Sequence, residues 1–305
     1  MIQGIDISRH QGDVDFKQVE NANMSFCFCK ATEGADYTDP LVAVYWESLL
    51  DTWMYRGLYH FARPDLRAGR SGGEKEGRHF ASVAKTLGHY QKGSLPPMLD
   101  FEKYSESDGQ ENIPWIQGWL DVVENELGRA AGIYTGANIW RYEVSNTADF
   151  ADRTLWQVDY TKTRTEPKVI ANGNWPWSFW QWSGGGDYAY YGPVAGIKGA
   201  VDVNRFNGGQ QELDALAMVP NAPAESHEGI MPVVDIATAS QETVMRVQGL
   251  LLSHGFGPEG LVGKDGHPDG IPGQKTLGAL SAFNSIIGAQ ESTLVSPQTW
   301  YCLLS

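Results

Sequence analysis

Short runs of apolar residues recur along the N-terminal part of the chain, with the length and β-branched or aromatic content of buried strands. We predict eight strands, at residues 3–8, 26–31, 57–62, 97–102, 131–134, 154–160, 178–182 and 199–203. Helical spacing of apolar residues appears between the earlier strands, at 40–56, 73–88 and 113–127. Alternation of strands and helices predicts a parallel sheet, and eight strands predict a closed barrel. We therefore expect an α/β fold, an irregular (β/α) barrel with eight strands that is helix-poor in strands 6–8.

A change in composition divides the chain into two domains. Residues 217–234 are rich in Pro, Ala and polar residues, which is typical of a linker. They separate a barrel at 1–216 from a smaller module at 235–305. No apolar run approaches the roughly 20 residues that a transmembrane helix needs, so we expect no membrane insertion.

The pattern of the second domain predicts helices. Ser240 is a candidate N-cap for an amphipathic stretch that Gly255 ends. A second stretch with helical spacing covers 274–287, and another follows Pro297. We expect a small all-α domain with three helices.

Charge and cysteine content narrow the function classes. The net charge of −14 repels nucleic acid and anionic lipid, and it favours a neutral or cationic ligand. Cys27 and Cys29 lie two residues apart in a predicted strand, and Cys302 is remote. This spacing forms neither a disulfide framework nor a zinc signature, so we interpret Cys27 and Cys29 as small hydrophobic residues.

Two carboxylates interrupt the apolar strand at 97–102. Asp100 and Glu102 are two residues apart, so on a strand they share one face while Leu99 and Phe101 bury on the other. They stand near the C-terminal end of the strand, where parallel barrels build their active sites. This placement indicates a working pair rather than a solvated charge run.

Three further strands present an acid from apolar surroundings. Asp6 follows Ile5 in the first strand, Asp159 follows Val158 in the sixth, and Asp202 stands between two valines in the last. In a barrel these acids are expected to converge at one end, where burial and like charge separate their pKa values into acid and base roles.

Converging carboxylates serve either divalent metal binding or glycosidic cleavage. The seven histidines do not lie at ligand spacing with the acids, so we expect no metal and no cofactor. Ten of the eleven tryptophans fall within residues 1–182, and flat aromatic faces suit the C–H faces of sugar rings. The aromatic content favours a sugar substrate.

The first 213 residues resemble the family 25 glycoside hydrolases, lysozyme-like N-acetylmuramidases that cleave peptidoglycan. The matching segments are Gly4-Ile5-Asp6-Ile7-Ser8 with Gln11-Gly12, Lys30-Ala31-Thr32-Glu33-Gly34, Gly57-Leu58-Tyr59-His60-Phe61, Leu99-Asp100-Phe101-Glu102, Gly132-Ile133-Tyr134-Thr135, Leu155-Trp156, Trp180-Gln181-Trp182-Ser183 and Val201-Asp202-Val203-Asn204. The resemblance implies a barrel in which only the first five strands have full helical crossovers.

The same resemblance implies roles for individual residues. Glu102 would be the proton donor, and Asp100, Asp6 and Asp202 would be the other acids of the site. The residues that we expect to bind substrate are Tyr59, Phe61, Tyr134, Gln181, Trp182, Tyr160 and Asp159. Two of them depart from the family pattern, since many relatives have Tyr at the position of Trp182 and Ala at that of Asp159.

The second domain resembles the three-helical peptidoglycan-binding module of wall hydrolases. The match rests on Val247-Gln248 with Leu251 and Gly255, on Asp269-Gly270-Ile271-Pro272-Gly273-Gln274-Lys275-Thr276, and on Ala279-Leu280 with Phe283. The usual pattern has an aromatic residue where Ile271-Pro272 stand and Gln where Asn284 does. A packing or dimerisation appendage is the alternative.

These observations predict an enzyme that cleaves the β-1,4 bond between N-acetylmuramic acid and N-acetylglucosamine. The two-residue spacing of Asp100 and Glu102 leaves open whether a protein carboxylate, an inverting water or the substrate's own acetamido oxygen attacks. The alternatives are a non-catalytic glycan-binding protein and a chitinase-like N-acetylglucosaminidase. The acid at Glu102 argues against the first, and the absence of the longer run D-x-x-D-x-D-x-E argues against the second.

The expected setting follows from the start of the chain. Residues 1–6 show neither a basic n-region nor an apolar h-region, so no secretory signal is visible. We expect a monomer made in a host cytoplasm that acts on cell-wall glycan, as a bacteriophage endolysin released through a membrane lesion would.

Overall fold

The computed structural model describes residues 1–88, 92–104, 111–218, 234–257, 259–264, 266–287, 293–296, 299 and 303. The chain divides into two compact units, Met1–Asn221 and Ala222–Ser305. Of the predicted linker at 217–234, only residues 217, 218 and 234 lie within the described residues. Each unit is described by itself below.

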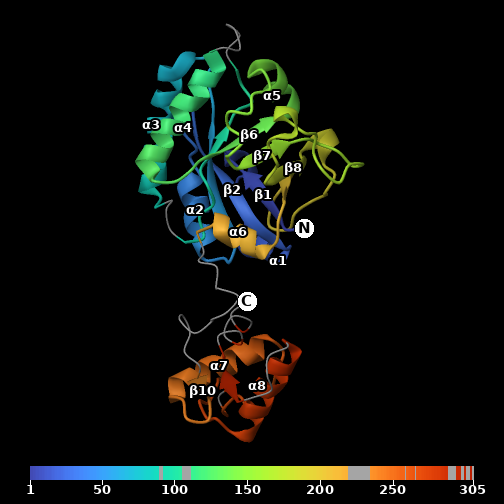
Figure 1. Cartoon of the computed structure of the whole chain (residues 1–305). Helices are drawn as coiled ribbons and strands as arrows, with labels where there is room; N and C mark the ends of the chain where they lie inside the picture. Colours follow the sequence, from blue (N-terminus) through green and yellow to red (C-terminus); the bar gives the residue numbers. More distant parts are fainter. Residues whose placement is uncertain are drawn as a thin grey trace. The chain divides into compact units, whose positions relative to one another are not determined.

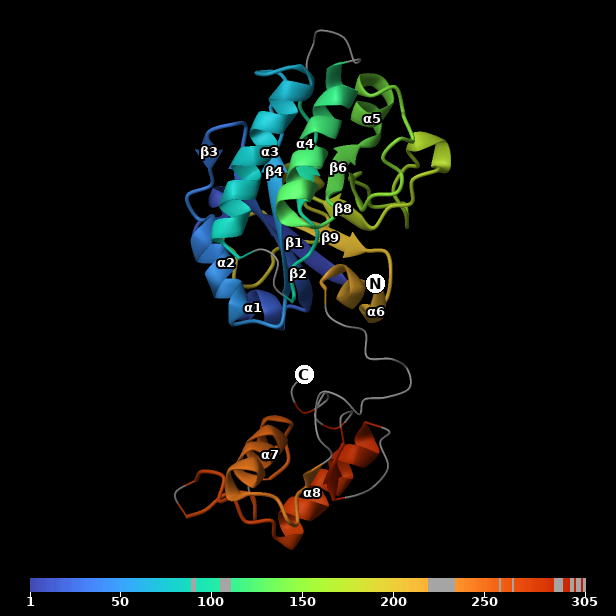
Figure 2. The same ribbon diagram turned by 60° about the vertical axis from the view of Figure 1, so that its left-hand side comes forward.

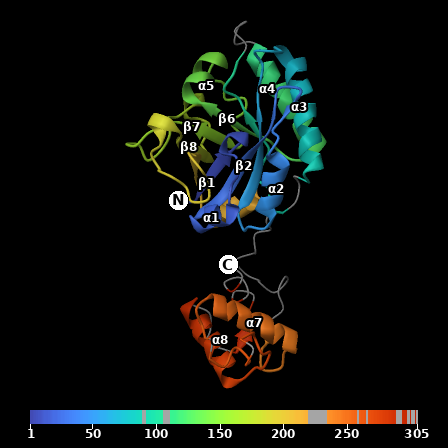
Figure 3. The ribbon, with the colours of Figure 1, turned by 180° about the vertical axis from the view of Figure 1, so that it is seen from behind.

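Eight strands close a barrel in the first unit (Figure 1). They are β1 (Gln3–Ile7), β2 (Met24–Glu33), β4 (Tyr55–Phe61), β5 (Met98–Asp100), β6 (Gly132–Gly136), β7 (Leu155–Val158), β8 (Phe179–Ser183) and β9 (Asp202–Phe206). Their order is β1-β9-β8-β7-β6-β5-β4-β2, and β1 and β2, side by side in Figure 3, complete the ring. The short β3 (Tyr37–Thr38) pairs with the end of β2. The predicted eight-stranded barrel is confirmed, with strand ends shifted by at most three residues.

In the connections between successive barrel strands, helices occur only after the first five strands. They are α1 (Phe16–Asn21), α2 (Val42–Leu50), α3 (Gly69–Thr86), α4 (Asn112–Leu127) and α5 (Ala137–Glu143). Helices α3 and α4 lie side by side on the outside of the barrel (Figures 1 and 2). Residues 159–201 are all described, and the only helical elements among them are two short 3₁₀ turns, Ala171–Gly173 and Gly186–Tyr188. The predicted scarcity of helix in the second half is confirmed.

The last strand runs against its neighbours, which corrects the prediction of a wholly parallel barrel. β9 pairs antiparallel with both β8 and β1, whereas the other neighbouring strands of the ring pair parallel. A parallel return needs a crossover to the other end of the barrel. The chain after β8 makes loops and one 3₁₀ turn and enters β9 from the same end, so the start of β9 stands beside the ends of the parallel strands.

The alternation of side chains along each strand separates two cores. Ile5 and Ile7 of β1 face outward into the layer packed against the helices, and Cys27 and Cys29 of β2 do the same. Both cysteines are buried and form no disulfide, as predicted for small hydrophobic residues. The inner face carries an aromatic cluster that fills the barrel. Its aromatic members are Phe26, Phe28, Tyr59, Tyr134, Trp156, Phe179 and Phe206. Helix α6 (Gln210–Leu216) contributes Leu213 to this cluster.

The second unit holds helices α7 (Gln241–Ser253) and α8 (Gln274–Ile286), both close to their predicted ranges. The Ser240 side chain accepts from the Thr243 backbone N–H, which confirms the predicted N-cap. Most of the third predicted helix, after Pro297, lies outside the described residues. A short antiparallel pair, β10 (Val234–Asp235) with β11 (Leu294–Val295), corrects the purely helical prediction. Segments this short carry no strand pattern in sequence.

Gly57 of β4 leaves room for the aromatic cluster, because a Cβ there would stand 2.2 Å from Cδ1 of Phe28. We expect Gly57→Ala to destabilise the barrel by about 1–3 kcal/mol, the usual cost of overpacking, measured by urea unfolding. Phe28→Leu in the same chain removes the colliding ring. The double variant should therefore lose less free energy of unfolding than the two single variants lose in sum. Strict additivity would contradict this account.

Candidate active site

Four carboxyl groups converge at one end of the barrel. Asp6 lies in β1, Asp100 ends β5, Glu102 follows two residues later, and Asp202 begins β9 directly opposite Asp6 in the strand register. Glu102 acts electrostatically on Asp6, Asp100 and Asp202, as a group close to all three must. Asp6 and Asp100 are only 8% and 7% exposed, whereas Glu102 is exposed at the mouth. The most accessible acid is therefore Glu102.

The strand β5 is shorter than predicted but keeps the predicted side-chain alternation. Its ladder ends at Asp100, although the Phe101 N–H still donates to the Tyr134 carbonyl at 2.9 Å. Phe101 is buried in the outer core near Trp115. Asp100 and Glu102, on either side of Phe101, are thus left to the inner face.

Gln181 of β8 connects the acids with two tyrosines. Its Nε2 donates to Oδ2 of Asp6 at 2.9 Å and to Oδ2 of Asp202 at 3.4 Å. Its Oε1 accepts from the hydroxyls of Tyr134 at 2.9 Å and Tyr160 at 2.8 Å. Burial raises the pKa of both tyrosines, which keeps their hydroxyls protonated as donors. Gln181 is therefore oriented by the tyrosines and in turn holds Asp6 and Asp202.

Asn204 is a second holder of Asp6 and was not among the predicted site residues. Its Nδ2 donates to Oδ2 of Asp6 at 2.8 Å, and its Oδ1 accepts from Nε1 of Trp156 at 2.7 Å. Asn204 is fully buried. The signal that could have found it is its spacing, because a residue two positions after Asp202 shares the same face of the strand.

Burial raises the pKa of all four acids, and the charge of Glu102 adds to the rise at the other three. Burial raises the pKa of Asp6 to about 6, against the hydrogen bonds of Asn204 and Gln181. Burial, with the charges of Asp6 and Glu102, raises that of Asp202 to about 8. Burial and the Glu102 charge raise the pKa of Asp100 well above its ordinary value. Desolvation also raises the pKa of Glu102, against Lys103 and Lys30. The cluster can hold protons near neutral pH, as general acid catalysis requires.

The predicted aromatic residues Tyr59 and Phe61 lie on the inner face of β4 beside the acids. Tyr59 meets Trp156 edge to face at a centroid distance of 6.0 Å, and its pKa is raised by burial and by the charges of Asp6, Asp100 and Asp202. The Nζ of Lys30 stands 4.4 Å from the centre of the Phe61 ring. Lys30, a further residue that the prediction omitted, is a cation close to this acidic cluster.

Two predicted substrate-binding residues are not brought to the acids. Asp159 receives hydrogen bonds from Nη2 of Arg164 at 2.5 Å and from the Lys168 backbone N–H at 2.9 Å. Trp182 packs beneath Arg205, whose guanidinium lies 3.8 Å from the ring centre. Each follows a residue whose side chain faces inward, so the strand alternation turns Asp159 and Trp182 away from the barrel interior.

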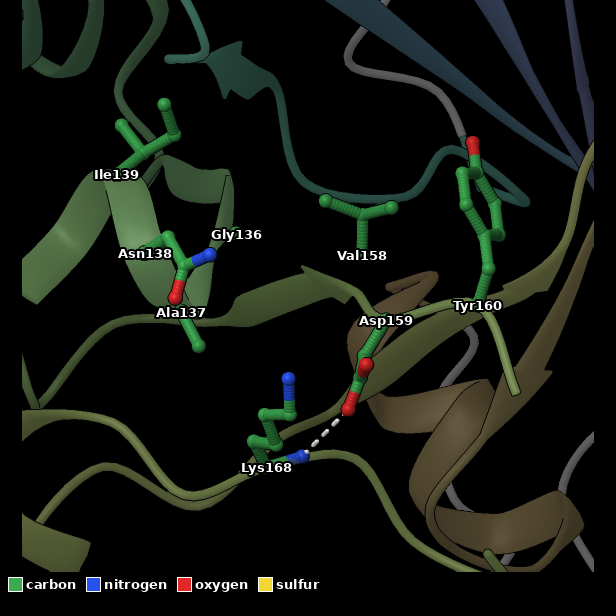
Figure 4. A pocket seen from close by; sticks show the side chains of 8 residues that line it. All are labelled: Gly136, Ala137, Asn138, Ile139, Val158, Asp159, Tyr160 and Lys168. Carbon is green, nitrogen blue, oxygen red and sulfur yellow. Dashed lines mark hydrogen bonds between the residues drawn. The ribbon is translucent and has the colours of Figure 1, made fainter. Parts of the chain in front are cut away.

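A cavity of about 200 Å³ adjoins Tyr160 at the ends of β6 and β7. Its lining residues are Gly136, Ala137, Asn138, Ile139, Val158, Asp159, Tyr160 and Lys168 (Figure 4). In Figure 4 the Tyr160 ring points away from Asp159 and Lys168. Tyr160 lines this cavity, and its hydroxyl donates to Gln181, which also hydrogen-bonds to Asp6 and Asp202.

Neither a metal-binding group nor a membrane-spanning helix occurs among the described residues. In this part of the chain, no three His, Cys, Asp or Glu side chains are arranged so that they could hold a metal ion. No helix of the same residues is both long and apolar enough to cross a bilayer.

A closed barrel with clustered acids, a buried amide and aromatic side chains at its mouth is an arrangement that glycoside hydrolases use. The family description "Glycosyl hydrolases family 25" matches residues 5–189, and the chain belongs to this family. Lysozyme M1 of Streptomyces globisporus is 31% identical over 71% of this chain and 71% of its own length.

Solved structures agree with the family match. The bacterial lysozyme of Streptomyces coelicolor is 30% identical, with a TM-score of 0.62, and the match covers 71% of this chain and 96% of that one. A family GH25 lysozyme from Aspergillus fumigatus is 28% identical, with a TM-score of 0.60, over 71% of this chain and 98% of that one. Membership of this family implies hydrolysis of peptidoglycan.

The raised pKa of Asp202 predicts how stability changes with pH. A carboxyl with a higher pKa in the folded state binds its proton more tightly there, so stability falls as pH rises from about 4 toward 8. We expect Asp202→Asn to lose less of its free energy of unfolding over that pH interval than the unmodified chain. Asp152→Asn removes a carboxylate that is 79% exposed and is the control for loss of one charge. Equal pH dependence in all three chains would contradict the prediction.

Proposed function

We propose that the protein hydrolyses the β-1,4 bond between N-acetylmuramic acid and N-acetylglucosamine in bacterial peptidoglycan. The observation that carries this proposal is the pairing of an exposed acid, Glu102, with a buried acid, Asp100, two residues apart at the mouth of a family 25 barrel. We include in the proposal the endolysin role that the sequence led us to expect.

In this proposal Glu102 is the general acid. Its position at the mouth gives it access to a glycosidic oxygen, and its raised pKa favours the protonated form that must donate. Asp6 and Asp202, held by Gln181, supply negative charge opposite the developing oxocarbenium ion. Acid catalysis and charge stabilisation are then divided between different side chains of one cluster.

Asp100 orients the acetamido group of the substrate, whose oxygen is the nucleophile. Oδ1 of Asp100 is buried and has no hydrogen-bond partner among the described residues. A buried acceptor without a donor costs about 1–3 kcal/mol. The N–H of a 2-acetamido sugar is a donor that would satisfy Oδ1, and this observation favours substrate assistance over direct attack by Asp100.

The two other functions compatible with a glycan site receive less support. A non-catalytic binding protein has no use for an accessible acid with a raised pKa beside a buried one. A chitinase-like enzyme also cleaves 2-acetamido sugars, but the positions before Asp100 are Pro97, Met98 and Leu99 rather than the acids of the longer chitinase run.

Glu102→Gln tests the acid assignment. Since general acid catalysis contributes roughly 10²–10⁴-fold, we expect the rate of reducing-end release from peptidoglycan to fall by that factor, and Asp100→Asn to be comparably impaired. The control Glu47→Gln, on the exposed face of α2, should keep the full rate. Retention of more than about a hundredth of the rate by Glu102→Gln would refute the assignment.

Mass spectrometry of the products tests which bond is cleaved. It should find muramic acid at the new reducing ends, whereas glucosamine there would refute the proposed bond.

We also propose that the second unit binds peptidoglycan. Some of the residues that carry its resemblance to wall-binding modules form one hydrogen-bond network around the buried Gln248. Nε2 of Gln248 donates to Oδ1 of Asp269 at 2.8 Å and to Oγ1 of Thr276 at 3.0 Å, and its Oε1 accepts from the Gly270 N–H at 2.9 Å. This network fixes the loop that presents Ile271, which is 60% exposed.

Sedimentation with insoluble peptidoglycan tests the second unit. Both chains carry Glu102→Gln so that the wall is not digested, and one of them ends at residue 221, the boundary between the compact units. We expect the full chain to sediment with the wall at lower protein concentration than the shortened one. Equal sedimentation would indicate that the second unit has no part in wall binding.

A further inference from the structure

A second cavity, of about 320 Å³, lies at the mouth of the barrel on the side of β2, β3 and β4. Its charged and aromatic lining comprises Arg9, Arg63, Arg67, Glu33, Asp36 and Tyr37. Three guanidinium groups gathered in one cavity are notable in a chain with a net charge of −14. We call it the arginine cavity.

The arginine cavity adjoins the carboxylate cluster. Glu33 in its wall pairs with Nζ of Lys30 at 2.7 Å, and Lys30 lies over the ring of Phe61 on the inner face of β4. Glu33 is also the register partner of Phe61 between β2 and β4. Both Lys30 and Glu33 act electrostatically on Asp100. A sugar bound at the acids would therefore extend a substituent toward the arginine cavity.

Arg9 is held in place by its backbone and by an aromatic ring. It begins the 3₁₀ turn Arg9–Gln11 after β1, and Ser8 caps that turn. The Arg9 N–H donates to Oδ2 of the buried Asp39 at 3.0 Å, and the guanidinium lies 5.5 Å from the centre of the Tyr37 ring. The backbone hydrogen bond and the Tyr37 ring thus position the Arg9 guanidinium without an ion pair among the described residues.

The arginines differ in how far their charges are already neutralised. Arg63 pairs with Glu33 at 3.0 Å and with Asp65 at 2.8 Å. Arg67 reaches only Asp36, at 3.9 Å, and Asp36 is itself 80% exposed. Within the described part of the chain, no carboxylate pairs with the guanidinium of Arg9. Arg9 and Arg67 therefore retain the capacity to bind an anion.

We propose that the arginine cavity binds a carboxylate carried by the muramic acid substituent of the glycan. The proposal rests on the proposed function and specifies its substrate further. The unsubstituted sugar ring is neutral and gains little from guanidinium groups, whereas the forked N–H donors of arginine match a carboxylate. The carboxylate has two possible sources, the lactyl group itself when no peptide is attached, or the stem peptide that is linked to it.

Binding of soluble tetrasaccharides with alternating N-acetylglucosamine and N-acetylmuramic acid tests the proposal. Three forms are compared: one with stem peptides, one with free lactyl carboxylates and one with the lactyl groups capped as methylamides. All chains carry Glu102→Gln, so that Kd is measured without turnover. We expect Arg9→Gln to raise the Kd of a carboxylate-bearing form about 5–20-fold, as loss of a charged hydrogen bond should, and to leave that of the methylamide form within about twofold.

The pattern of losses identifies the carboxylate. If Arg9→Gln raises the Kd of the peptide form alone, the carboxylate belongs to the stem peptide. If it raises the Kd of the free lactyl form, the carboxylate is that of the lactyl group. An equal rise in Kd for all three forms, or no rise for any of them, would overturn the proposal. Arg78→Gln, an exposed arginine of α3 with a side chain 58% exposed, is the matched control and should bind all three forms unchanged. Failure of the proposed function would be seen separately, as tetrasaccharides left uncut by the chain with Glu102 intact.

Discussion

The repulsion among four carboxyl groups gathered at one end of a barrel is the constraint on which this structure depends. Asp6, Asp100, Glu102 and Asp202 are partly withdrawn from water, and the charges of Glu102 and Asp6 raise the cost of charging their neighbours in the cluster. The fold offsets that cost with neutral donors. Gln181 and Asn204 satisfy Asp6, and the tyrosines fix the amide of Gln181 so that its N–H groups face the acids. The raised pKa values allow the cluster to hold protons near neutral pH, where general acid catalysis needs them.

The packing of the barrel interior holds the strand ends that carry the acids. An interior filled with aromatic rings gives the strand ends a rigid base, and Trp156 connects that base to Asn204 through its indole N–H. The antiparallel β9 is equally important, because it puts the first residue of the last strand at the same level as Asp6. Strand direction and aromatic packing together determine the distances on which the chemistry depends.

The mouth of the barrel is electrostatically divided, although the chain as a whole is acidic. Acids gather at its centre, while Lys30 and the arginine cavity lie on the side of β2 and β4. Ion pairs with Glu33 connect the two regions and hold the cations close to the acids without neutralising them all. A substrate that is a neutral sugar with an anionic substituent would match this division of charge.

The sequence by itself determined the barrel strands and the apolar strands from which the four clustered acids project. Alternation is a local property, so Asp100 and Glu102 could be assigned to one face, and Asp6 and Asp202 to apolar strands, without knowledge of their neighbours. The tertiary structure alone decided that β9 runs antiparallel, that Gln181 and Asn204 hold Asp6, and that Arg9 and Arg67 share a cavity. It also placed Arg164 beside Asp159 and Arg205 over the ring of Trp182. These outcomes depend on which strands and loops become neighbours in space, and a pattern read along one segment carries no information about that.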